Sequence, residues 1–207
     1  MPITISGSGT ISGINAGGYP DSSVNTEDLN AGTASAGQSL VAAGASGAMS
    51  WGSSIVSGTA QNSTSGTAID FTGIPSWVKR ITVMFNGVST SGTSNLQILL
   101  GTSSGFESTG YIGAAGYGGS GATTWNSTGF LLYTIMNAAN TLSGSAKVEV
   151  VSTNTWTESG ILAMNTGNAP CLSGGSKSLS STLDRVRITT VNGTDTFDAG
   201  SINIMYE

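Results

Sequence analysis

Three acidic side chains near the end of the sequence are the first candidates for chemistry. Asp184, Asp195 and Asp198 are close enough in sequence to lie together, and paired carboxylates can serve as general acid and base or bind calcium. Asp195 follows Asn192 and Gly193, a pair typical of tight turns, in which an aspartate side chain usually bonds to the nearby backbone. We therefore favour a turn over a calcium site at these residues, and a calcium site over catalysis.

Other catalytic arrangements lack the residues that they need. The chain contains no histidine, so the commonest general base and the usual zinc ligand are missing, and no Ser–His or Cys–His pair can form. The sequence "GYGGSG" at residues 116–121 matches the letters of a dinucleotide-binding loop, but the residues after it predict strand or loop instead of the required helix. We expect no enzyme activity, no catalytic residue, no metal and no cofactor.

A glycine-rich segment with scattered aromatic residues is the best candidate for binding. Residues 105–129 contain eight glycines, and their aromatic side chains have few aliphatic neighbours, which suits contact with sugars or with another protein. Trp156 has a similar setting in the sequence "NTWTESG". The candidate receptor or glycan contacts are Phe106, Tyr111, Tyr117, Trp125 and Trp156. The alternative is that these rings only cover the ends of a β-sandwich.

The composition restricts the class of protein. Charged residues make up 8% of the 207 residues, against about 25% in an ordinary soluble domain, and glycine and hydroxyl side chains replace them. The net charge is −5 and the six basic residues form no run, so we expect no nucleic-acid partner. The longest apolar run, residues 130–136, is far too short to span a bilayer, so we also expect no membrane insertion.

Residues 1–48 are too poor in large apolar side chains to form a core of their own. They contain three acidic residues and no basic one, and they have neither the positive nor the apolar region of a secretory signal, so we expect none. Their apolar residues are still more numerous than a linker needs, which favours ordering by another chain over disorder. These candidate attachment residues are Ile3, Ile5, Ile11, Ile14, Val24 and Leu29.

From residue 49 onward the chain alternates short apolar strands with Gly, Ser and Asn turns. Residues 78–88 place Ile81, Val83 and Phe85 on one face, and similar sets recur about eight to ten times at the spacing typical of a β-sandwich or jelly roll. Two hairpins are expected, one joining residues 55–56 to 68–71 and one joining the last two strands through "NGTD". The predicted fold is therefore all-β and antiparallel, with a sandwich domain over residues 49–207.

Two blocks of this domain carry a family resemblance. "FTGIPSWVKRITVMFNGVSTSGTSNLQILLG" (71–101) and "LDRVRITTVNGTDTFDAGSINIMYE" (183–207) resemble the C-terminal domain of tail-fibre-like proteins in tailed bacteriophages and prophages. The resemblance spans residues 67–207, and the stretch between the blocks has no close match. In addition, "GGYPDSSVNTEDLNAG" (17–32) is similar to one copy of the unit Gly-x-Val-Thr-Thr-x-x-Leu-x-x-Gly that such fibres repeat along their shafts, with Asn25 in place of the first threonine.

The resemblance implies a structural protein on the outer surface of a virion, made in the host cytoplasm and assembled as a homotrimer. Residues 1–48 would then be the attachment and trimerisation segment that binds another virion protein, of the tail or the capsid, and residues 49–207 would face outward. The implied function is a short trimeric tail fibre that binds a host cell-surface glycan or protein.

Two other functions remain open at the level of sequence. The alternative favoured by the short chain and the single shaft-like unit is a capsid decoration (cement) or head-fibre protein, anchored to the capsid by its N-terminal arm. A third reading, a glycan-degrading or sugar-binding enzyme module, would normally need a longer chain and two positioned carboxylates.

Overall fold

The computed structural model describes residues 38–42, 49–52, 54–118, 123–134, 136–165 and 170–207. Every regular element in these ranges is a β-strand, which confirms the all-β prediction. Accordingly, no helix with the length and apolar character needed to cross a membrane occurs in them. The chain divides into two compact units, Met1–Ser54 and Ile55–Glu207, a few residues later than the boundary expected after residue 48.

The described part of the first unit is a short hairpin. Strand β1 (Ser39–Ala42) pairs antiparallel with β2 (Met49–Gly52), with Leu40 opposite Trp51. The segment expected to begin the sandwich therefore belongs to the first unit. The six candidate attachment residues, Ile3, Ile5, Ile11, Ile14, Val24 and Leu29, lie outside the described residues.

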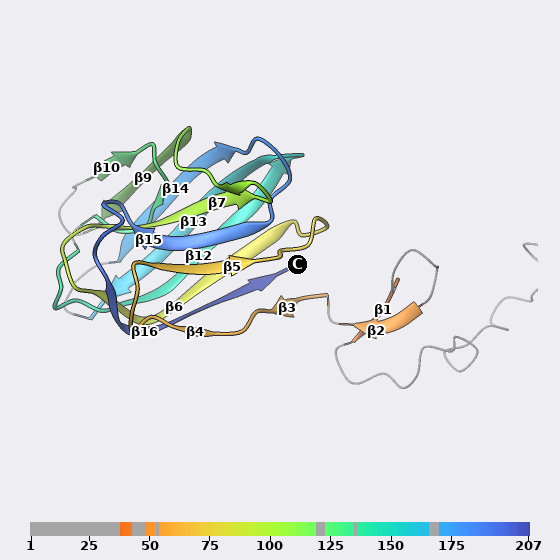
Figure 1. The fold of residues 1–207 in the computed structure, drawn as a ribbon, viewed down its shortest axis with the longest axis horizontal. Coiled ribbons are helices and arrows are strands. Elements are labelled where there is room, and N and C mark those ends of the chain that lie inside the picture. The colour runs from red at the N-terminus through yellow and green to blue at the C-terminus, as the bar shows by residue number, and fades with distance from the viewer. Residues whose placement is uncertain (1–37, 43–48, 53, 119–122, 135, 166–169) are drawn as a thin grey trace, which may run out of the picture. The chain divides into compact units, whose positions relative to one another are not determined.

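The second unit contains a large antiparallel sheet (Figure 1). Its strands follow the order β10-β9-β14-β13-β12-β6-β16-β3, and β4 pairs with β16 beside β3. The bounds are β3 (Val56–Ser57), β4 (Gln61–Asn62), β6 (Arg80–Thr90), β9 (Tyr111–Tyr117), β10 (Thr123–Asn126), β12 (Leu142–Ser152), β13 (Thr155–Met164), β14 (Cys171–Ser178) and β16 (Phe197–Tyr206).

A smaller sheet covers one face of the large sheet, which makes the unit a β-sandwich. Its order is β11-β7-β15-β5, with β8 also beside β7, and Figure 1 shows β5, β7 and β15 as a second layer. A bond from the Leu100 backbone N–H in β7 to the Tyr111 hydroxyl in β9, 2.7 Å long, joins the two layers. The bounds are β5 (Ala68–Thr72), β7 (Leu96–Thr102), β8 (Gly105–Phe106), β11 (Phe130–Leu131) and β15 (Arg185–Thr190).

Four strand pairs nest one inside the next along the chain. They are β6 with β16, β7 with β15, β9 with β14, and β12 with β13. Nested pairs of this kind occur in jelly rolls, which divide them between two sheets. Here three of the pairs lie in the large sheet and one in the small sheet, so the jelly roll itself stays a prediction.

The core lies between the sheets and follows the alternation of the sequence. Ile81, Val83 and Phe85 in β6 are buried, as predicted, because successive side chains of a strand point to opposite faces. The residues predicted to face inward in β7 and in the last two strands are also buried, although in β7 the residues between them are buried as well: Leu96, Ile98, Leu100, Val186, Ile188, Ile202 and Ile204. Each such side chain contributes about 1.5–3 kcal/mol through removal of apolar surface from water.

Both predicted hairpins are wrong. Strand β15 pairs with β5 and β7 in the small sheet, whereas β16 pairs with β6, β3 and β4 in the large sheet, so the turn at Gly193 crosses between layers. Likewise Val56 pairs with Tyr206 and makes no pair with β5. Alternation determines which face of a strand is buried, but two strands that face each other across the core have the same pattern as two that pair within a sheet.

Candidate binding surface

Trp125 is the most accessible of the five predicted contact rings. It lies on β10, an edge strand that pairs only with β9 among the described residues, and 66% of its surface is exposed. Its register partner is Ala114, whose small side chain leaves the large face of the indole open on the outer side of the sheet. Tyr117, at the end of β9, is half-buried. Trp125 is therefore placed as a contact residue would be.

Two of the predicted contact residues, Tyr111 and Trp156, are core residues, so the prediction is wrong for them. Tyr111 is 1% exposed and packs edge-on against Phe130 with ring centroids 5.0 Å apart. Trp156 is 4% exposed, and its indole N–H has no hydrogen-bond partner among the described residues. Period-two alternation places both rings on the inner face of the large sheet, so a partner cannot reach them while the sandwich is intact.

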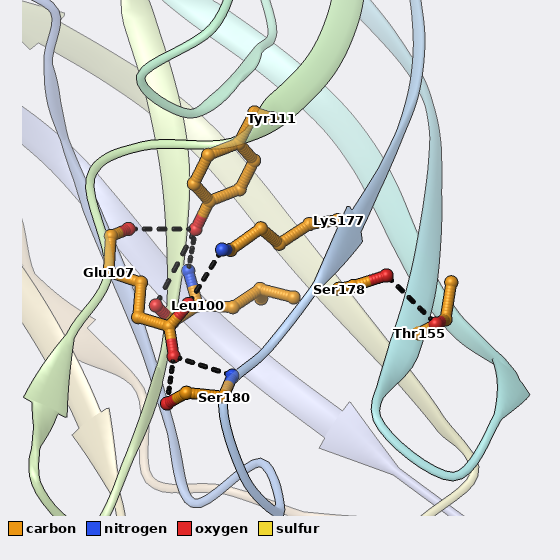
Figure 2. Close-up of polar contacts among 7 residues, drawn as sticks. All are labelled: Leu100, Glu107, Tyr111, Thr155, Lys177, Ser178 and Ser180. Carbon is orange, nitrogen blue, oxygen red and sulfur yellow. Dashed lines mark hydrogen bonds and ion pairs between the residues drawn. The ribbon is translucent and has the colours of Figure 1, made fainter.

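Tyr111 belongs to a partly buried polar network that holds the beginning of the glycine-rich segment (Figure 2). Its hydroxyl donates to the Glu107 carbonyl at 3.0 Å and accepts from the Leu100 N–H, and burial raises the pKa of this phenol. Next to it, the Lys177 ammonium lies 2.6 Å from the Glu107 carboxylate. Ser180 donates to the same carboxylate through its backbone N–H and its hydroxyl, at 2.9 and 2.6 Å.

The network connects a loop to the large sheet electrostatically. Burial by itself would raise the pKa of Glu107, but the hydrogen bonds from Lys177 and Ser180 outweigh it and lower that pKa. Lys177 also lies 5.4 Å from the centroid of the Tyr111 ring, within the range of a cation–π contact. All these groups have partners in the fold, so the network positions residues 105–111 and offers no free group to a ligand.

Phe106 is half-buried, and its ring already has an intramolecular partner. The Arg187 guanidinium lies 4.1 Å from the ring centroid, and Arg185 lies at 5.8 Å. Arg187 in turn makes two 2.7 Å hydrogen bonds to Asp70, which raise the pKa of the guanidinium. A ligand would have to displace these arginines to stack on Phe106, so this ring is a weaker candidate than Trp125.

The three C-terminal aspartates do not form a site. Asp184 bonds to the side chain of its neighbour Arg185, and Asp195 accepts from the Ser94 backbone N–H at 2.9 Å and from Asn192 at 2.7 Å. Asp195 thus has a structural role in the turn and in holding the β6–β7 loop, but the local backbone bonds predicted for it are made by Asn192, which accepts from the N–H groups of Thr194 and Asp195. No group of three or more metal-binding side chains is found among the described residues.

Glu158 is a buried carboxyl that sequence reasoning missed. It lies on the inner face of β13, accepts a 2.8 Å hydrogen bond from Ser173, and leaves its second oxygen without a partner in the described structure. Burial raises its pKa to about 7. The signal was available, since Trp156, Glu158 and Leu162 share one parity in "TWTESGIL" and must face the same side.

Three more exposed apolar side chains lie on the outer face of the large sheet, one to three strands away from Trp125. Ile112 in β9, Ile161 in β13 and Leu172 in β14 are each more than half exposed. Ile161 and Leu172 are register partners, so their side chains lie side by side. Sequence reasoning did not single out these three residues, because a single exposed aliphatic residue is common and only the strand order brings them together.

Comparisons with known proteins add no relative. No family model matches the chain, and neither a curated protein nor a solved structure matches it.

Proposed function

We propose that this chain is a non-enzymatic structural protein of a tailed-phage virion: a short trimeric tail fibre that attaches to the host. The proposal is supported by the resemblance of residues 71–101 and 183–207 to such fibres and by the exposed apolar surface around Trp125. Exposed contiguous apolar surface on a soluble protein marks an interaction site. Its partners would be other copies of itself, another virion protein, and a glycan or protein on the host cell.

The observation that carries the proposal is where the two resembling blocks fall in the fold. They form β7 and β15 of the small sheet, the last two residues of β5, and the adjacent pair β6 and β16 of the large sheet. The intervening residues, without a close match, form β9, β10 and β12–β14, which carry the exposed side chains. The framework thus resembles fibre domains, whereas the exposed surface comes from the part of the chain that has no close match. This arrangement suits a receptor-binding protein.

A non-enzymatic role agrees with the state of the carboxylates. Asp70, Asp184 and Glu107 each make an ion pair, and Glu158 is buried against Ser173. The paired carboxylates of a glycan hydrolase are instead placed to act as acid and base on a bound sugar, whereas Glu149 and Glu207, which line one open hollow, both lie beside Arg80. The role that we propose for this surface is therefore to bind the host and leave the bound molecule uncleaved.

Gold-labelled antibodies against residues 55–207, applied to intact particles of the phage that encodes the chain, test the proposal. Label at the tail tip or baseplate is expected for a host-binding fibre. Label spread over the head would instead establish the alternative, a capsid decoration or head-fibre protein. Particles without label would contradict a role in the virion altogether. Light scattering on the purified protein tests the homotrimer independently, with a mass of three 20.6 kDa chains as the expected result.

A further inference from the structure

The outer face of the large sheet contains a continuous row of small side chains with a larger residue at each end. The register places Trp125, Ala114, Gly174, Ser159 and Lys147 opposite one another on adjacent strands from β10 to β12. We call these five residues the outer-face row; all of them are exposed. With strands about 4.8 Å apart, the row is about 19 Å long, enough for several sugar rings in a chain.

Apolar side chains flank this row on both sides. Leu172 and Ile161 are register partners in the neighbouring row, and Ile112 lies on the other side of Ala114. At the Lys147 end the surface is hollowed by about 350 Å³, and Ser145, Ser159, Ile161 and Leu172 are among the residues that line the hollow. The face thus combines an aromatic ring, aliphatic flanks and free hydroxyls.

Lys147 is the one charged member of the row. It makes no ion pair or hydrogen bond within the described structure, whereas Lys177, Arg185 and Arg187 each have an acidic partner. The nearest acidic residue on its strand face, Glu149, lies 3.6 Å from Arg80. An anionic group on a ligand would therefore find an unpaired cation at this end of the row.

The size and polarity of the face decide which partner fits. Four apolar side chains on this face, Trp125, Ile112, Ile161 and Leu172, are each more than half exposed, which is typical of a contact surface. The strands β9, β14, β13 and β12, which carry four of the five row residues, are paired on both edges, so a peptide strand could add only along β10 at the Trp125 end. A partner that contacts only side chains is favoured.

We propose that the outer-face row binds a linear glycan that carries a carboxylate or phosphate group, with one sugar ring stacked on Trp125 and the acidic group at Lys147. This inference rests on the proposed function, since it names the class of host molecule that the fibre would bind. The apolar faces of the sugar rings would lie against Leu172, Ile161 and Ile112, and the serine hydroxyls at the hollow would exchange hydrogen bonds with sugar hydroxyls.

Gly174, in the middle of the row, offers a steric test that leaves the fold intact. A Cβ built there has only the Glu158 carbonyl oxygen nearby, at 3.7 Å, and the residue does not have a positive φ. Gly174→Leu should therefore fold normally and fill the row with an isobutyl group. Ala163→Leu is the matched control, because Ala163 is exposed on β13 but lies beyond Ile161, outside the row.

The experiment measures binding of the full chain to immobilised linear oligosaccharides, from tri- to hexasaccharides, each in neutral, uronate-containing and phosphate-substituted forms. We expect an acidic form to bind more tightly than its neutral counterpart. Gly174→Leu and Trp125→Ala should each weaken that binding at least tenfold, and Lys147→Gln should abolish the preference for the acidic form. Ala163→Leu should bind as the unmodified chain does.

Three results would overturn the inference. The first is that no probe binds, and the second is that Gly174→Leu leaves binding unchanged. The third is that Gly174→Leu changes the oligomeric mass in light scattering, which would make this face a subunit interface. Failure of the proposed function is distinguishable from these. If virions are labelled but Gly174→Leu leaves sugar binding unchanged, only the glycan site is refuted. If Gly174→Leu weakens sugar binding but particles carry no label, only the virion role is refuted.

Discussion

The Lys177 ammonium group lies 2.6 Å from a carboxylate oxygen of Glu107, and the two residues differ in their access to water. The Lys177 side chain is 6% exposed and the Glu107 side chain 21%. Glu107 also accepts two hydrogen bonds from Ser180, whereas the cation depends on Glu107 for its charge partner. Glu107 lies in the loop that follows β8, and Lys177 lies in β14, so the pair connects the beginning of the glycine-rich segment to the large sheet (Figure 2).

This asymmetry predicts unequal costs for removal of the two partners. Glu107→Ala leaves a buried ammonium without a counterion and should lower the free energy of unfolding by about 3–5 kcal/mol. Lys177→Met should cost only about 1–2 kcal/mol, because Glu107 keeps its bonds to Ser180 and some contact with water. Urea unfolding of both single variants and the double variant measures these costs and the coupling between them. Equal costs for the two single variants would contradict the assigned asymmetry.

Glu158 predicts a stability that falls as the pH rises. Its pKa is about 7 in the folded chain against a usual value of 4.5, so the folded protein holds this proton to a higher pH than the unfolded chain does. Stability from this group is therefore fully present below about pH 4.5 and is lost as the pH rises through about 7. The loss should be on the order of 3 kcal/mol, and melting temperatures between pH 5 and pH 8 would show it.

Glu158→Gln is the control for that pH dependence. The amide has nearly the same shape and no ionisation, so it should retain the bond to Ser173 and raise the melting temperature at pH 8 relative to the unmodified chain. At pH 5 the two proteins should differ little, because Glu158 is then protonated. A variant with the same slope against pH as the unmodified chain would assign the slope to another group.

The sequence was sufficient to predict which face of a long strand is buried, but it was insufficient to predict which strands pair with each other. Alternation in "RITVMF" determines which side chains of β6 are buried, because the pleat has a period of two residues, whereas every residue of β7 is buried. The pairing of β6 with both β12 and β16 depends instead on contacts between residues far apart in sequence. The two hairpin predictions failed for this reason, as local pattern does not say in which sheet the next strand lies.

The candidate site shows the same division between local and long-range information. Tyr111 resembled an exposed ring because glycines and alanines surround it, yet the inward-facing Gly175 provides space for Phe130, the ring against which Tyr111 packs. At Gly175 an added Cβ would lie 3.1 Å from the Phe130 ring. The outer-face row was not predictable, because it joins four strand pairs whose register only the fold determines.

Gly200 predicts a large effect of a single methyl group. Its φ is +90°, and a Cβ there would lie 2.6 Å from the Asn86 carbonyl oxygen and closer still to the carbonyl of Gly87. Gly200→Ala should therefore cost about 2–5 kcal/mol. Gly193→Ala is the matched control: its φ is +69°, but nothing lies within 4 Å of the added Cβ, so only the conformational cost of about 1–2 kcal/mol applies. Thermal unfolding should place Gly200→Ala well below Gly193→Ala, and the reverse order would contradict this account.

Removal of residues 1–54 separates attachment from folding. The buried core cluster lies within Ile55–Glu207, so the truncated chain should keep its β-sheet circular dichroism and a melting temperature close to that of the full chain. Under the proposed function, the same truncation should abolish incorporation into particles. Immunoblots of purified virions measure this, and particles that carry the truncated protein at normal copy number would rule out an N-terminal anchor.

Two tryptophans provide the sharpest distinction between binding and folding. Trp125→Ala removes a ring that is 66% exposed on an edge strand, so the melting temperature should change by no more than about 2 °C, whereas attachment to host cells should weaken. Trp156→Ala removes a ring that is 4% exposed and should cost about 3–5 kcal/mol through the cavity that it leaves.

Tyr117→Ala, at the half-buried end of β9, should weaken attachment less than Trp125→Ala. Cell-binding assays on the three folded variants, at a temperature where Trp156→Ala is still native, complete the test. Unchanged attachment by Trp125→Ala would return this ring to a purely structural role and would remove the aromatic end of the outer-face row from the proposed glycan site.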